Sequence, residues 1–378
     1  QGKASEQFNA SLLHEPWDIQ TGQGSPYKVF TPFWKTCLTG SEPSETLPPP
    51  PRIPPPSSWP ATIRLHELGL DPNKSWTRGL DEAWRPGEDG AGESLQRFLE
   101  EALHAYAEDR DRPDRRGTSH LSPHLHFGEI SARTVWHAIR QHAEWTETRG
   151  LFKGAEAYLR QLGWREFSHH LLYHFPETAE APLRPEFADF PWRADAASLK
   201  AWQQGRTGYP IVDAGMRELW ATGWMHNRVR MIAGSFLVKD LLRPWQEGAR
   251  WVWDTLVDVD LANNTMGWQW VSGCGADAAP YFRVFNPVLQ GKKFDPDGTY
   301  VRRWVPALRD VPDKFIHEPW KMPPLLQQAA SCHIGSDYPA PVLGFGHLIL
   351  LIDPAKLWVS PLSSESHRSD CSTSFPAR

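Results

Sequence analysis

The segment LVDVDLANNTMGWQW, at positions 256–270, combines residue types that seldom occur together. Asp258 and Asp260 supply carboxylates, Asn263 and Asn264 supply amides, and two tryptophans complete the segment. Buried carboxylates and amides need hydrogen-bond partners, because an unpaired polar group inside a protein is costly. A planar heteroaromatic ligand with ring nitrogens and carbonyls would provide those partners, and so would a nearby guanidinium such as that of Arg230. The segment therefore favours a flavin-like ligand, which spacing alone does not identify.

A second polar group lies in GTSHLSPHLHFGEIS, at positions 117–131. Thr118, Ser119 and Ser122 precede a predicted helix start, where hydroxyls and free backbone N–H groups suit a phosphate. The same residues would also serve as an ordinary helix N-cap, and the sequence alone leaves both interpretations open. The three histidines of this segment match no familiar metal-ligand spacing, so we predict no metal site.

The segment YLRQLGWREFSHH places a tryptophan between polar side chains. Gln161, Trp164 and Arg165 follow helical spacing, so they share one helix face. Such a face suits stacking and hydrogen bonding to a nucleic-acid base. The alternative is a helix that packs this tryptophan into the core and pairs Arg165 with a carboxylate.

The segment LWATGWMHNRVRMI has a comparable composition. Arg228 would reach a phosphate while Asn227 and Met231 face a pocket, and Arg230 lies on a different face. An amphipathic helix with a solvated basic side is the alternative interpretation.

The elements that must position these groups are predicted to be helices. In ESLQRFLEEALHAYAEDR the apolar residues recur at helical spacing, and strand-like alternation is rare along the chain. Similar helical patterns cover residues 129–142, 155–175, 213–240 and 246–257. We therefore expect one mainly α-helical domain over residues 93–341.

The flanking regions have different compositions. Residues 41–92 contain PPPPRIPPPSSWP and predict a proline-rich interdomain linker. Residues 1–40 are loop-like and then aromatic, whereas residues 342–378 become serine-rich and predict a disordered tail.

Bulk composition limits the class of protein. The 378 residues suffice for one or two domains, and the net charge of −5 excludes a globally basic nucleic-acid binder but not a local basic groove. Tryptophan outnumbers tyrosine 20 to 8, which indicates packing or stacking roles for indoles. The four cysteines show no disulfide or zinc pattern, and no apolar run is long enough to span a membrane. We expect a soluble, cytoplasmic monomer.

Five segments, taken in order, resemble the C-terminal catalytic domain of the DNA photolyase/cryptochrome family. They are GTSHLSPHLHFGEIS, QLGWREF, TGYPIVDAGMRELWATGWMHNRVRM, DVDLANNTMGWQW and GADAAPYFRVFNP, within residues 90–320. The WMHNR and WQW motifs are most similar to the cyclobutane-pyrimidine-dimer photolyases of class I. The resemblance implies an all-helical FAD-binding domain, preceded in residues 1–40 by a remnant of the family's α/β antenna domain.

The resemblance also implies which residues hold noncovalent FAD. Asp258 would pair with Arg230 beside the ring system, Asp260 would bond to its polar edge, and Asn264 would lie at flavin N5. The implied cofactor-binding residues are Tyr106, Thr118, Ser119, Leu121, Ser122, Arg165, Arg230, Asp258, Asp260 and Asn264.

The implied activity is light-driven repair of cyclobutane pyrimidine dimers, in which excited reduced FAD gives an electron to a dimer flipped out of damaged DNA. A tryptophan relay would run from Trp268, nearest the flavin, through Trp245 to Trp192 near the surface. Simple core packing is the alternative for each of the three. The implied DNA-binding residues are Gln161, Trp164, Asn227, Arg228, Met231 and Trp270, with Lys292 and Lys293 as further phosphate contacts.

Three departures from the family qualify this expectation. Only the last piece of the antenna domain is present, so we expect that its chromophore, a folate or deazaflavin, does not bind well. Gln161 stands where many dimer photolyases have glutamate, and the tail after Val342 does not resemble the family's charged terminal helix.

Two rival functions also fit parts of the sequence. A cryptochrome, a blue-light receptor without repair activity, would share the fold, but Asn227, Met231 and Trp270 argue against it. A glycoside hydrolase would use tryptophan platforms and Asp258 with a second carboxylate about 5–10 Å away. That rival predicts a colourless protein and leaves the order of the five segments unexplained.

Overall fold

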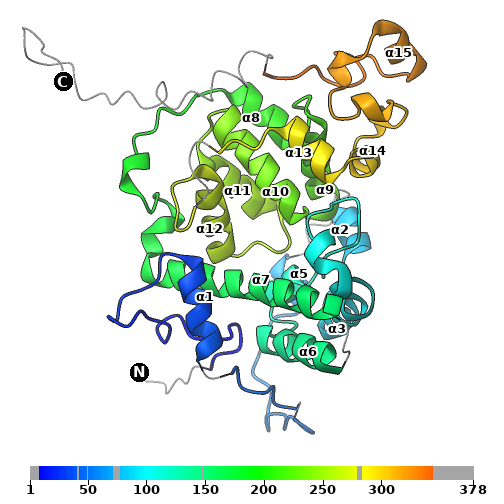
Figure 1. The fold of residues 1–378 in the computed structure, drawn as a ribbon. Helices are drawn as coiled ribbons and strands as arrows, with labels where there is room; N and C mark the ends of the chain where they lie inside the picture. The colour runs from blue at the N-terminus through cyan, green and yellow to red at the C-terminus, as the bar shows by residue number, and fades with distance from the viewer. Residues whose placement is uncertain are drawn as a thin grey trace, which may run out of the picture.

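The computed structural model describes residues 8–40, 42–48, 50–70, 77–145, 149–278 and 283–343, and these residues form a mostly helical fold (Figure 1). Among them, one isolated bridge between Ile334 and Tyr338 is the only β-type pairing. The expected mainly helical architecture is therefore confirmed. The α-helices are α1 (Phe30–Thr39), α2 (Arg78–Ala83), α3 (Glu88–Arg97), α4 (Tyr106–Asp109), α5 (Ser122–His126), α6 (Ala132–Trp145), α7 (Arg149–His174), α8 (Ala196–Gln203), α9 (Pro210–Thr222), α10 (Asn227–Ser235), α11 (Trp245–Thr255), α12 (Leu261–Ser272), α13 (Pro287–Phe294), α14 (Thr299–Trp304) and α15 (Pro324–Ala329).

Local capping signals set the ends of the two helices that matter most for the site. The side chain of Asp260 accepts a hydrogen bond from the N–H of Asn263 at 2.9 Å, and α12 begins at the next residue, Leu261. The helix ends at Gly273, whose φ of +86° suits glycine. In the same way, His226 Nδ1 accepts from the N–H of Arg228 at 3.2 Å and starts α10.

The periodic segment 213–240, predicted as one helix, is interrupted. Gly223 has a φ of +69°, a left-handed conformation that ends α9 and turns the chain. A Cβ at this position would also lie 2.3 Å from Leu80 Cδ2, so the position suits only glycine. The apolar period continues across the turn because α9 and α10 both pack on the same core. A π-helical turn, Phe236–Asp240, follows α10.

The long helix α7 separates two hydrophobic cores. Figure 1 shows it running across the molecule, with α6 on one side and α9 to α13 on the other. One core joins α7 to α1, α3 and α6, and the other joins α8 to α12 with α14. The second core buries the indoles of Trp202, Trp245 and Trp268, which accounts for part of the high tryptophan content.

Helix α7 also fixes the segment that precedes α1. Glu166 Oε2 accepts hydrogen bonds from the N–H groups of Leu13 at 2.9 Å and His14 at 3.1 Å. Arg165 Nη1 donates to the carbonyl oxygen of Ser11 at 2.7 Å. Adjacent charged residues of one helix therefore bind a segment that lies more than 150 positions away in the sequence.

The expected linker, residues 41–92, is not a uniform extended segment. Helix α2 lies inside it, and α3 begins at Glu88, before the predicted domain start at residue 93. Trp84, between these helices, donates its indole N–H to the carbonyl oxygen of Thr222 at 2.7 Å, so this part of the chain is tied to α9. Residues 42–48 and 50–64 form no helix.

The end of the described chain is anchored by a buried aspartate. Asp213 accepts hydrogen bonds from the N–H and hydroxyl of Thr207, from the N–H of Gly208 and, at 2.6 Å, from the hydroxyl of Tyr338. The N–H of Val342 donates to the carbonyl oxygen of Thr207 at 2.9 Å. The predicted disordered tail lies outside the described residues from position 344 onward.

Candidate functional site

The centre of the candidate site is an ion pair between α10 and the start of α12. Arg230 Nη2 lies 2.8 Å from Asp258 Oδ2, and Arg230 Nε donates to the carbonyl oxygen of Met225 at 2.6 Å. The Asp258 side chain is 3% exposed, and its second oxygen, Oδ1, is buried without a hydrogen-bond partner. A buried acceptor of this kind requires a donor, which a ligand with ring N–H groups would supply.

The polar residues at the start of α12 mostly bind one another. Asp260 caps the helix and also accepts from Asn263 Nδ2 at 2.7 Å, and Asn263 Oδ1 accepts from the hydroxyl of Ser168 at 2.9 Å. Asn263, to which the family resemblance assigns no role, thus links α12 to α7. Asn264 Nδ2 donates to the carbonyl oxygen of Ala249 in α11 at 3.2 Å, which leaves its Oδ1 as a hydrogen-bond acceptor.

The hydroxyl-rich loop before α5 lies beside α7. The hydroxyl of Tyr158 donates to Ser119 Oγ at 2.9 Å, and the ring of Tyr158 packs edge-on against that of Tyr106, with centroids 5.2 Å apart. Both tyrosines are buried, and burial raises the pKa of Tyr106 to about 12. Tyr158 was missed in the sequence, although it lies one turn before Gln161 on the same helix. In this loop Leu121 is buried, Thr118 is half-buried and Ser122 is exposed.

The same loop also contacts the turn between α9 and α10. His120 has a φ of +55°, and its ring lies 4.4 Å from that of Trp224 between centroids. Burial lowers the pKa of His120 to about 4. Burial also lowers the pKa of His226 to about 4, and the buried Nε2 of His226 has no hydrogen-bond partner. Both imidazoles are therefore neutral near pH 7 and offer nitrogen atoms to a ligand.

The three tryptophans expected to form a relay lie in or against one core cluster. Trp268 in α12 packs directly on Gly248 of α11, where a Cβ would lie 2.1 Å from Trp268 Cη2. Trp245 is buried at the start of α11, whereas Trp192 is half-buried. The N–H of Arg193 donates to the carbonyl oxygen of Leu242 at 2.9 Å, which holds the segment of Trp192 against the residues that precede α11. A further tryptophan, Trp202, which no sequence pattern singles out, meets Trp268 edge-on, with ring centroids 6.3 Å apart.

The residues expected to contact DNA bases are distributed over α7, α10 and α12. Asn227 is exposed, and its Nδ2 lies 3.9 Å from Met231 Sδ. Trp270 is half-buried and stacks with Phe285 at 6.3 Å between ring centroids. Gln161 Nε2 donates to the carbonyl oxygen of Ala157 in its own helix at 3.2 Å.

Trp164 and Arg165 both have protein partners, as the alternative interpretation of their helix face expected. The ring of Trp164 stacks on Phe30 of α1, with centroids 3.7 Å apart, so one of its two faces is already covered. Arg165, expected at the flavin, donates to Ser11 and lies 3.7 Å from Glu166 Oε1. The cause is the close packing of the N-terminal segment and α1 on α7.

The expected phosphate contacts are also paired within the protein. Arg228 Nη2 lies 2.7 Å from Asp111 Oδ2, and Lys292 forms an ion pair with Glu318. Lys293 Nζ lies 5.0 Å from the centre of the Phe294 ring.

Comparisons with known proteins identify the family. Residues 158–347 match the FAD binding domain of DNA photolyase, and residues 1–55 match the DNA photolyase family. The chain is 46% identical to the deoxyribodipyrimidine photo-lyase of Agrobacterium fabrum, over 91% of this chain and 71% of that protein. It is 43% identical to cryptochrome-2 of Arabidopsis thaliana, over 90% of this chain and 57% of that protein. The chain belongs to the DNA photolyase/cryptochrome family.

Solved structures agree with this membership but do not favour the expected class. A class III photolyase from Agrobacterium tumefaciens has a TM-score of 0.87 and 46% identity, covering 92% of this chain and 72% of its own. A Synechocystis cryptochrome has a TM-score of 0.73 and 29% identity. The motifs that suggested class I therefore do not decide the class, and this photolyase-family chain is also similar to cryptochromes.

The residues of this photolyase-family chain fit FAD. The domain matched by residues 158–347 is an FAD-binding domain. The ion pair offers the unpartnered Asp258 Oδ1, the neighbouring turn offers the unpartnered His226 Nε2, and the loop before α5 offers the hydroxyls of Thr118 and Ser119. Ring N–H groups of such a ligand would donate to Asp258, ring carbonyls or nitrogens would accept from His226 Nε2–H, and a diphosphate would accept from the hydroxyls.

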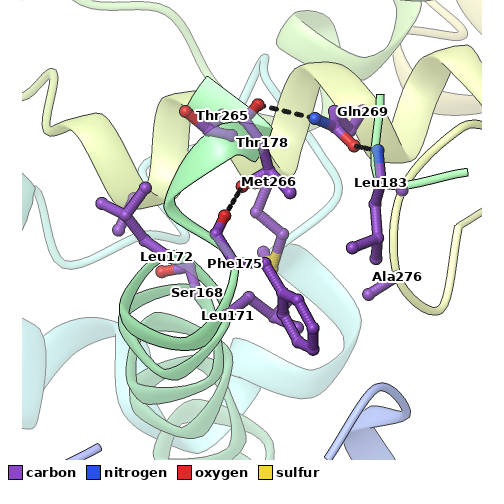
Figure 2. Close-up of a pocket in the computed structure, with 12 residues that line it drawn as sticks. Ser168, Leu171, Leu172, Phe175, Thr178, Leu183, Thr265, Met266, Gln269 and Ala276 are labelled. Atoms are coloured by element: carbon purple, nitrogen blue, oxygen red, sulfur yellow. Dashed lines mark hydrogen bonds between the residues drawn. The ribbon is translucent and has the colours of Figure 1, made fainter. Parts of the chain in front are cut away.

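A different cavity, between α7 and α12, does not fit that ligand. Figure 2 shows its mainly apolar lining, with Phe175, Leu183 and Met266 around it. Its single amide, Gln269, is already bonded to the carbonyl oxygen of Thr178 at 2.7 Å and to the N–H of Leu183 at 3.0 Å. The cavity volume of about 20 Å³ is on the scale of a water molecule, so it is a packing defect and not a dinucleotide site.

The described part of the chain offers neither a membrane-spanning helix nor a cluster of metal ligands. None of its helices is both long and apolar enough to cross a bilayer. The same residues contain no group of three metal-ligating side chains. Of the three histidines in the loop around α5, His124 instead bonds through Nδ1 to Glu129 at 2.5 Å.

Proposed function

We propose that this protein repairs cyclobutane pyrimidine dimers in DNA under blue light with FAD as its cofactor. One observation carries the proposal: α10 presents Asn227 at the surface and, one turn later, Arg230 in the ion pair with Asp258. The expected dimer contacts and the expected flavin contacts therefore belong to the same short helix. Photoexcited, reduced FAD would supply the transferred electron.

The protein's own residues have separate tasks in this proposal. Arg230, Asp258, Asp260 and Asn264 would bind and orient the ring system, and His226 lies beside them. Tyr106, Thr118, Ser119, Leu121 and Ser122 would hold the diphosphate side. Arg165 would add a flavin contact only through donors that Ser11 does not use.

The DNA side would use aromatic and polar contacts. Trp270 and the uncovered face of Trp164 would stack on the extruded dimer, and Gln161, Asn227 and Met231 would contact its bases. Trp268, Trp245 and Trp192 would deliver electrons from the surface to the cofactor. The half-buried position of Trp192 suits the outer end of such a relay.

The similarity to class III photolyases supports assignment to that kind of dimer photolyase rather than class I. A cryptochrome-like blue-light receptor is the alternative, because the identity to cryptochrome-2 is nearly as high. Against it stand Asn227, Met231 and Trp270, which a receptor without DNA repair does not require.

The decisive experiment uses the purified chain reconstituted with FAD and chemically reduced. It is mixed with an oligonucleotide that carries one thymine dimer, under blue light and in the dark, and with a matched oligonucleotide that carries a (6-4) photoproduct. Light-dependent repair of the dimer alone is the expected result. Bound FAD without repair of either substrate would favour the receptor, and repair of the (6-4) product would refute the substrate assignment.

A further inference from the structure

Three distant chain segments hold one arginine at the expected DNA surface. Arg228 Nη2 lies 2.7 Å from Asp111 Oδ2, and the guanidinium carbon Cζ lies 4.5 Å from the centre of the Phe294 ring. The backbone N–H of Arg228 is held by His226 Nδ1 at 3.2 Å. Asp111 follows α4, Arg228 belongs to α10 and Phe294 ends α13, so only the folded chain forms this arrangement.

This ion pair is not a solvated surface pair. The side chains of Arg228 and Asp111 are 17% and 30% exposed, and two of their atoms, Arg228 Nε and Asp111 Oδ1, are buried without hydrogen-bond partners. The guanidinium is therefore fixed at one edge by a carboxylate and on one face by an aromatic ring. Of its five N–H donors, Asp111 takes one, so others are available to a ligand.

Two more cations surround the same carboxylate and ring. Arg110 Nε lies 3.9 Å from Asp111 Oδ1, and Lys293 Nζ lies 5.0 Å from the centre of the Phe294 ring. The carboxylate of Asp111 thus faces two arginines, and Lys293 adds a third cation beside the ring, so these four side chains together carry a net positive charge. A phosphodiester is the kind of anion that such a cluster attracts, because a guanidinium binds phosphate oxygens through charge-assisted hydrogen bonds.

We propose that Asp111 is a positioning residue that holds Arg228 ready for a DNA phosphate, so that this acidic side chain strengthens DNA binding. The inference rests on the proposed DNA-repair function. A carboxylate near DNA normally repels the backbone, so its removal normally strengthens binding. Here the loss of the fixed arginine outweighs that gain, because an arginine that must be ordered during binding weakens affinity by about threefold to tenfold.

Asp109 provides a matched control on the same segment. It pairs with Arg115 at 2.5 Å, and the side chains of Asp109 and Arg115 are 23% and 51% exposed. Replacing either aspartate with alanine removes the same charge from nearly the same place. If charge alone matters, D111A and D109A must change DNA affinity in the same direction.

The experiment measures the affinity of the FAD-loaded protein for a duplex containing a thymine dimer, by fluorescence anisotropy over a range of salt concentrations. We expect D109A to bind as well as the unmodified protein or more tightly. We expect D111A to bind about threefold to tenfold more weakly, with a log–log salt slope that is smaller by about one phosphate contact. The isosteric D111N, which keeps an acceptor for Arg228, should fall between them, and the FAD absorbance of each variant reports its folding.

Double variants separate positioning from other effects. In an R228A background, D111A should cause no further loss, because Asp111 acts through Arg228. Tighter binding by D111A, or a loss that persists in the R228A background, would overturn the inference. If the unmodified protein itself does not bind the damaged duplex, the proposed function fails and this inference fails with it. If the unmodified protein binds the damaged duplex and D111A and D109A change its affinity equally, the role of Asp111 is refuted while the proposed function stands.

Discussion

Replacing Glu166 with glutamine should change how the stability of the protein depends on pH. The Glu166 side chain is 2% exposed, and burial raises its pKa to about 7 even though the N–H groups of His14 and Leu13 and the charge of Arg165 favour its ionised form. In the unfolded chain the same carboxyl returns to its ordinary pKa near 4.5. Glutamine has the same size and can accept the same two hydrogen bonds, so the substitution removes mainly the titration.

The sign follows from proton binding. Between the two pKa values the folded state binds more protons than the unfolded state, so the free energy of unfolding falls as the pH rises. The contribution of Glu166 is fully present below about pH 4.5 and is lost as the pH rises through about 7. For a shift of this size, the loss between about pH 5 and about pH 8 amounts to about 2–3 kcal/mol.

The assay is urea unfolding at about pH 5 and about pH 8 for the unmodified protein and E166Q. The exposed E156Q, on the same helix, is the control for loss of a glutamate charge. We expect the free energy of unfolding of E166Q to rise by about 2–3 kcal/mol relative to that of the unmodified protein between the two pH values, and that of E156Q not to rise. Other buried acids, such as Glu218, are present in all three proteins and cancel in the difference. A parallel pH profile for E166Q and the unmodified protein would refute the reasoning.

Three further substitutions test the site. Trp270→Ala should weaken binding to dimer-containing DNA by about tenfold or more while FAD stays bound, because it removes one stacking surface; a binding titration decides this. Trp192→Phe should slow photoreduction of the oxidised protein, as followed by flavin absorbance, without slowing repair by chemically reduced protein, and a loss of repair would exclude a pure relay role. Gly248→Ala places a methyl group 2.1 Å from Trp268 Cη2 and should displace that indole. We expect a lower melting temperature and a slower photoreduction of the flavin. An unchanged rate of photoreduction would mean that the first electron donor is a different residue.

Much of the helical pattern could be predicted because it depends on neighbours in the sequence. The apolar spacing over residues 155–175 predicted most of α7, and the polar segment at 256–270 predicted a cluster that the structure builds around Asp258. The break at Gly223 was missed because the apolar period continues through it. A left-handed glycine can interrupt a helix without changing which residues are buried.

The partners of charged and aromatic residues could not be predicted in the same way. Glu166 binds N–H groups 153 and 152 positions away, and Arg228 binds a carboxylate 117 positions away. Periodicity shows which side of a helix is polar but not which distant segment faces it. The covered face of Trp164 is an example, because the sequence placed this indole on a polar face and Phe30 now lies against it.

The arrangement of α10 explains why one short helix can serve both a cofactor and DNA. Successive turns of an α-helix are about 5.4 Å apart along the axis. The geometry of the helix therefore keeps Asn227 and Arg230 close to each other, independently of the conformation of the surrounding loops. His226 fixes the first turn through its cap, and Asp258 fixes Arg230 through the ion pair. An electron that passes from a flavin beside Arg230 to a base beside Asn227 would therefore cross a distance set by a rigid element. Because mutations in the surrounding loops leave that distance unchanged, they should alter DNA affinity far more than the rate of repair once DNA is bound.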